Sequence, residues 1–141
     1  MSYQIKRADR LIDTLEFVSK GGGVALQIDV NIEIGKVASR YRACWLNIIE
    51  AQKKLVSTED GSPDLEEAMA ALESAVLSTY GLLFGEQATQ HMLGFFDGDV
   101  EEMLEQTLPF VRDVVVPAIQ SYSEQRKQEL KEKYSSKKRR A

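Results

Sequence analysis

The chain has few of the residue types from which chemical sites are usually built. Its 141 residues include one cysteine, Cys44, and one histidine, His91. A single cysteine excludes an internal disulfide framework, and His91 has no second histidine or cysteine nearby with which to hold a metal. We therefore expect His91 to be structural and Cys44 to be a small buried hydrophobic residue.

Long apolar runs are also missing. No stretch of the sequence approaches the roughly 18 apolar residues that a membrane span requires. No apolar signal region follows Met1. These two features predict a soluble, cytoplasmic protein that is not secreted and does not bind a membrane.

Motifs for catalysis or cofactor binding are absent as well. The glycines of residues 21–23 are not followed by Gly-Lys-Ser/Thr, and a strand pattern comes after them, so they do not form a phosphate-binding loop. Carboxylates gather between Asp97 and Glu105, but without the ligand order of an EF-hand; Asp99 and Glu102 fit a helix capping box instead. No serine, cysteine or lysine has a recognisable base beside it. We expect no enzyme activity, no cofactor and no metal.

Charge is divided unevenly along the chain. Residues 57–113 hold thirteen acidic residues against Arg112 alone, a net charge of −12, whereas residues 123–141 hold eight basic and three acidic residues, a net charge of +5. The basic end has three interpretations: a nucleic-acid contact, a contact with the acidic surface of another copy, or a solvated terminus. The acidic centre makes nucleic acid the less favoured partner and favours a homo-oligomer.

The N-terminal part predicts a β-hairpin over residues 11–32. Large apolar residues occupy every second position over residues 24–32, and residues 11–18 place Leu15 and Phe17 on one face. Helical spacing then predicts a helix over residues 33–56 and a second helix that starts at Ser62-Pro63, its antiparallel neighbour.

The expected fold is mainly α with an N-terminal β-hairpin (α+β), in which antiparallel helices pack around an aromatic core. We predict one domain over residues 1–134, with a loose arm over residues 2–10, and a disordered basic tail over residues 135–141. Four aromatic residues are expected to hold the core: Trp45, Tyr80, Phe84 and Phe96.

Residues 78–117 hold four of the five phenylalanines and organise the rest of the chain. Gly85 and Asp97-Gly98 predict breaks between helices, and Pro109 and Pro117 predict a kink or a restart of the last one. The aromatic elbow of residues 82–96 is either the centre of the core or a groove for a partner. Apolar stripes at helical spacing favour the core.

Adjacent apolar residues in this stretch suggest a binding surface. Phe95 and Phe96 lie about 100° apart on a helix, as do Phe110 and Val111, so one narrow stripe does not bury both members of a pair. Exposed apolar surface implies a partner or a second copy. The candidate partner contacts are Phe95, Phe96, Phe110 and Val114.

Three segments together resemble a family of small phage tail-assembly chaperones from siphophages and prophages of Gram-positive bacteria. These are the hairpin LEFVSKGGGVALQIDVNIEIGKVA, the motif LLFGEQATQHMLGFFDGDVEEML, and LPFVRDVVVPAI before a charged tail. The resemblance covers roughly residues 8–130. It lies in the order of the segments and in the succession of the LFG motif, the aromatic residues, the PF pair and the later proline.

The resemblance implies a non-enzymatic protein of the bacterial host cytoplasm that binds the long, apolar tape measure protein and keeps it soluble during tail assembly. It also implies self-association and, often, a longer frameshifted product. Two other classes stay open: a nucleic-acid-associated regulator of a mobile element, which would act through the basic end, and a structural tail or connector protein.

Overall fold

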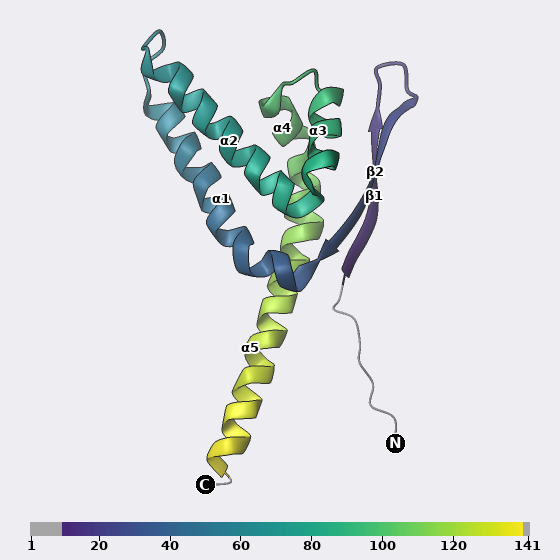
Figure 1. Ribbon diagram of the computed structural model, residues 1–141, viewed down its shortest axis with the longest axis vertical. Coiled ribbons are helices and arrows are strands. Elements are labelled where there is room, and N and C mark those ends of the chain that lie inside the picture. The colour runs from purple at the N-terminus through teal and green to yellow at the C-terminus, as the bar shows by residue number, and fades with distance from the viewer. Residues whose placement is uncertain (1–9, 140–141) are drawn as a thin grey trace.

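The computed structural model describes the backbone of residues 10–139 and the side chains of residues 10–135, so the predicted arm before Arg10 lies outside it. As predicted, the fold is mainly helical with an N-terminal antiparallel hairpin (Figure 1). The elements follow in this order: β1 Arg10–Val18, β2 Val24–Glu33, α1 Ile34–Ser57, α2 Asp64–Phe84, α3 Glu86–Phe95, α4 Val100–Phe110, the π-helical turn η1 Val111–Val115, and α5 Val116–Arg139.

The hairpin uses one face for packing and leaves the other in solvent. Leu15 lies opposite Ile28 and Leu11 opposite Ile32, so the apolar residues of the two strands share one face of the hairpin. Ile28, Ile32 and Phe17 on that face are buried. At the tip, Val24 is 54% exposed, because the hairpin extends past the helices there (Figure 1).

Helices α1 and α2 form an antiparallel helical hairpin, as the short polar connection between them predicts (Figure 1). The hydroxyl of Ser62 accepts a hydrogen bond of 3.2 Å from the Asp64 N–H, which is the contact expected at a helix start. Three carboxylates in the first turn of α2 complement the positive end of the helix dipole.

Helices α4 and α5 and the turn η1 follow one another without a break (Figure 1). The turn lies between Pro109 and Pro117, where the sequence predicted a kink. The N–H of Val116 donates to the carbonyl of Val111, five residues back, which is the π-helical pattern. The irregularity is therefore a widened turn within a continuous helix.

The C-terminal part of α5 projects away from the rest of the molecule (Figure 1). Every side chain of residues 123–135 is exposed. Helix α5 continues to Arg139, because serine, lysine and arginine can extend a helix that is already nucleated; the disordered tail expected over residues 135–141 stays a prediction. Residues 140–141 lie outside the described part.

Two apolar clusters hold the fold together. The first surrounds Tyr80 and joins the hairpin tip to α1, α2, α3 and α4; the second joins the hairpin base and the start of α1 to η1 and α5. Tyr80 and Phe96 are buried as predicted, whereas Trp45 and Phe84 are only half-buried. Trp45 lies at the edge of the first cluster, where it stacks on Tyr41 with ring centroids 6.0 Å apart.

Helices α1 and α5 meet at a glycine. A Cβ placed on Gly35 would lie 2.9 Å from the Tyr122 hydroxyl oxygen and 3.3 Å from the ring carbon that carries it. A glycine at this position therefore lets Tyr122 approach the α1 backbone closely.

None of the helices within residues 10–139 is both long enough and apolar enough to cross a membrane.

Candidate functional site

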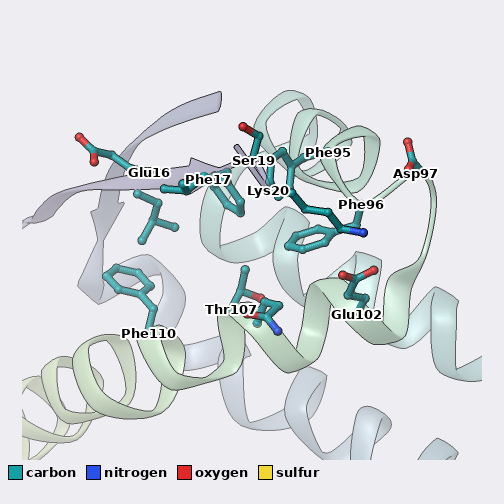
Figure 2. A pocket seen from close by; sticks show the side chains of 13 residues that line it. Glu16, Phe17, Ser19, Lys20, Phe95, Phe96, Asp97, Glu102, Thr107 and Phe110 are labelled. Atoms are coloured by element: carbon teal, nitrogen blue, oxygen red, sulfur yellow. The ribbon is translucent and has the colours of Figure 1, made fainter. Parts of the chain in front are cut away.

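A hollow lined by four phenylalanines lies between the hairpin and α4, and it has a volume of about 670 Å³. We call it the β1–α4 groove. Its strand side consists of residues 15–20 and its helix side includes Glu102, Gln106, Thr107 and Phe110, with residues 95–97 at the α3 end. Figure 2 shows Phe17 opposite the α4 residues Thr107 and Phe110, with Phe95 and Phe96 beside it.

Phenylalanine rings form the apolar lining of the groove. The centroid of the Phe17 ring lies 5.3 Å from that of Phe95 and 6.0 Å from that of Phe96, both edge to face. The rings of Phe95 and Phe96 are themselves 4.9 Å apart at 88°. Edge-to-face contacts at these distances stabilise the cluster beyond the burial of its area.

Three of the four predicted contact residues lie in this groove. Phe95 and Phe110 are half-buried, and Phe96 is only 8% exposed. Phe17 from the hairpin covers Phe96, whereas Phe95 keeps part of its surface exposed, so the two adjacent rings are not buried equally. Val114 is half-buried in η1 and does not line the groove.

A tight turn between α3 and α4 positions the Phe95–Phe96 pair. Asp97 has φ of 53° and Gly98 φ of 83°, so the chain reverses within two residues of Phe96. The carboxylate of Asp99 then accepts a hydrogen bond of 3.1 Å from the Glu102 N–H and starts α4; the other half of the predicted capping box is not formed, because the Asp99 N–H donates to the Phe96 carbonyl. The turn therefore places the aromatic end of α3 beside the first turns of α4.

The rim of the groove is predominantly acidic. Glu16, Asp97 and Glu102 are exposed carboxylates, and Lys20 from the hairpin turn is the basic residue among the lining groups. In Figure 2, the Lys20 amine lies on the side of the groove that holds Phe96 and Glu102, while Glu16 points outward. The lining has a net charge of −2 from these four residues.

The polar groups beneath the groove are satisfied by one another. Thr107 is buried, and its hydroxyl donates to the Met103 carbonyl at 2.6 Å, so the buried Tyr80 hydroxyl donates to the Thr107 oxygen. Burial raises the pKa of Tyr80 to about 12. The Tyr80 phenol is neutral and hydrogen-bonded to Thr107, so it acts as a structural group.

Other chemical groups do not gather here. Among the described residues, no three His, Cys, Asp or Glu side chains come together in a way that would hold a metal ion. Within the same part of the chain, every buried side-chain nitrogen or oxygen has a hydrogen-bond partner. What the groove offers is apolar area, an acidic rim and the edge of a strand.

Sequence reasoning missed the strand side of the groove. It placed Leu15 and Phe17 on the apolar face of the hairpin but did not assign them to a site. A signal existed: Phe17 is the one phenylalanine outside residues 78–117. Its partners depend on which helices the hairpin packs against, and period-two alternation does not determine that.

No family model, no curated protein and no solved structure matches this chain.

Proposed function

We propose that this protein is a phage tail-assembly chaperone that binds the tape measure protein and keeps it soluble during tail assembly. The observation that carries the proposal is the β1–α4 groove, into which Phe95 and Phe110 bring half-buried aromatic surface. The resemblance in the hairpin, in the motif around Gly85 and in the stretch after Leu108 supports the same role.

The chemistry of such a role is hydrophobic burial. A long apolar client aggregates through exposed apolar side chains, and a groove with aromatic walls covers part of that surface. Val18 and Val24, at the hairpin tip, are 53% and 54% exposed and lie opposite each other, so they extend the apolar surface beyond the groove. No bond is made or broken in this role.

The acidic character of the protein fits a holding function. Residues 57–113 carry a net charge of −12, and a well-hydrated charged surface of this kind helps to keep a complex with an apolar client in solution.

Co-expression tests the proposal. The protein is produced together with the tape measure protein encoded in the same phage or prophage. Gel densitometry measures the soluble fraction of this client, and an affinity pull-down tests for the complex. We expect the client to be soluble and to co-purify. A client that stays insoluble and forms no complex would show that the chaperone role is wrong.

A matched pair of variants locates the contact. Phe110→Ala removes a half-buried ring that lines the groove, and Phe84→Ala removes a half-buried ring that does not. The two rings are neighbours, with centroids 6.3 Å apart, so the variants perturb the same region of the fold. Only Phe110→Ala should reduce co-purification.

A nucleic-acid-associated regulator is the second candidate, and the projecting part of α5 is the observation that favours it. Arg126, Lys127, Lys131 and Lys133 are exposed there. Three glutamates on the same segment, one of them 3.7 Å from Arg126, offset most of that charge. Duplex binding that is tight, falls steeply with salt and is lost on deleting residues 135–141 would favour this candidate over the chaperone.

A further inference from the structure

The β1–α4 groove runs along the edge of a strand. Four successive strand residues, Leu15 to Val18, line it together with Ser19 and Lys20 of the hairpin turn. Alternate side chains of a strand point to opposite faces of the sheet, so a hollow that faced one side of the hairpin would touch every second residue. Contact with successive residues places the groove beside the backbone of β1.

That edge of β1 is unpaired within the described sheet. The sheet has two strands, and β1 pairs with β2 on its other side. In an antiparallel pair, every second residue directs its N–H and C=O groups away from the partner strand. These groups of β1 therefore point toward the groove and form a template for another strand.

Helix α4 provides the opposite wall. Glu102, Gln106 and Phe110 line the groove at intervals of four residues, which places them on one face of the helix. An open strand edge faced by a helix, with apolar rings between them, is the arrangement in which proteins bind peptides by strand addition.

We propose that the β1–α4 groove binds an extended polypeptide segment, which adds to β1 as a third strand and alternates apolar with basic side chains. The apolar side chains would pack on Phe17 and Phe110. The basic ones would meet Glu102 and Asp97 on the rim, where carboxylates outnumber amines three to one. The four strand residues Leu15 to Val18 give about 13 Å of edge against which a segment could pair.

This inference deepens the proposed function, because the bound segment would belong to the client chain. It rests on the geometry of the groove, so it is testable without the client. It also differs from the proposed function in what it requires: strand addition needs backbone hydrogen bonds, whereas chaperone activity requires only apolar burial.

The test uses a fluorescent heptapeptide in which lysine and valine alternate, and binding to the full chain is followed by anisotropy. Two further peptides carry N-methyl groups on alternate amides. In an extended peptide these amides all point to the same edge, and the two peptides are methylated on opposite edges. Only one edge faces β1 in a strand-addition complex. We expect one methylated peptide to bind at least about tenfold more weakly, the effect of one or two lost hydrogen bonds, and the other to bind like the parent. Equal binding of both would overturn strand addition.

Charge is tested with a peptide that replaces lysine by glutamate, and with a pair of variants on α4. Glu102→Lys alters the rim, whereas Glu105→Lys makes the same charge change at an exposed residue of the same helix that does not line the groove. The glutamate peptide and the Glu102→Lys variant should each weaken binding about tenfold or more, with Glu105→Lys near wild type. A similar loss in both variants would mean that the peptide adheres to the acidic body in general.

The two proposals fail separately. If the lysine–valine peptide binds with the expected edge dependence and the tape measure protein does not co-purify, the groove inference stands and the chaperone role falls. If the client is held in solution and the peptide does not bind, strand addition at β1 is wrong and the client is held elsewhere.

Discussion

At the scale of single residues, the buried pair of Tyr80 and Thr107 makes an asymmetric prediction. Thr107→Val removes the acceptor of the Tyr80 hydroxyl and leaves that donor buried without a partner, at about 1–3 kcal/mol. Tyr80→Phe removes the donor, and Thr107 keeps its bond to Met103. We therefore expect Thr107→Val to lower the free energy of unfolding by more than Tyr80→Phe, as measured by urea denaturation.

The double variant supplies the control for this pair. Once Tyr80 is phenylalanine, the Thr107→Val change no longer strands a donor, so its additional effect should shrink. Additive effects in the cycle would indicate that the two hydroxyls do not act on each other.

The same tyrosine predicts a loss of stability at alkaline pH. Burial raises the pKa of Tyr80 from 10.0 to about 12. Its contribution to the free energy of unfolding is complete below pH 10, where the phenol is neutral in both the folded and the unfolded chain. Between pH 10 and about 12, only the unfolded chain ionises, so the free energy of unfolding falls as the pH rises, by about 2–3 kcal/mol in total. Comparing wild type with Tyr80→Phe by denaturation across this range isolates the effect from that of the lysines; a constant difference would contradict it.

At the scale of secondary-structure elements, Phe17 fixes the hairpin on the helices. It is 7% exposed and contacts both Phe95 and Phe96. Phe17→Ala should cost about 3–5 kcal/mol. Because Phe84 is only half-buried, Phe84→Ala should lower the stability by less than Phe17→Ala does. Thermal melts of the two variants test this ranking. Equal melting temperatures would show that the hairpin packs more loosely than described.

The projecting part of α5, in contrast to Phe17, should contribute little to the stability of the fold. Because all side chains of residues 123–135 are exposed, deleting residues 124–141 removes helix without removing core. We expect the circular dichroism signal at 222 nm to fall and the melting temperature to change by only a few degrees. A large drop in melting temperature would mean that α5 packs against something in solution, such as a second copy.

The elements that the sequence predicted are those with a plain period. Alternation over residues 24–32 identified β2, and Ser62 and Asp99 identified the starts of α2 and α4. The turn η1 was not predicted. Its buried residues Val111 and Val115 continue a spacing of four from Thr107, which drifts by about 40° per step on an α-helix. A π-helical turn advances less per residue, so it keeps this stripe facing inward.

The site was predicted only in part, for a physical reason. Phe95, Phe96 and Phe110 were chosen because they crowd one helical stretch, and the structure does bring them to one groove. The hairpin side of that groove depends on packing between elements far apart in sequence. Spacing within a single element contains no information about such packing.

At the scale of the whole molecule, the division of charge predicts self-association. The acidic residues 57–113 include α2, α3 and α4, and the projecting part of α5, which holds Arg126, Lys127, Lys131 and Lys133, lies at the opposite end of the molecule (Figure 1). Opposite charges at opposite ends favour head-to-tail contact between copies. Sedimentation velocity should show association that rises with protein concentration and weakens from low to high salt. A monomer under all conditions would contradict this expectation.

The close approach of Gly35 and Tyr122 has a consequence for the order of folding. The two hairpins, β1 with β2 and α1 with α2, join neighbours in sequence, so each forms by closing a short loop. The contact of α1 with α5 closes a loop that spans most of the chain, which makes it the slow entropic step. Both hairpins can therefore form while the chain is still being synthesised. The β1–α4 groove becomes complete only after α4 has left the ribosome, so the ability to bind a partner would arise after both hairpins have formed.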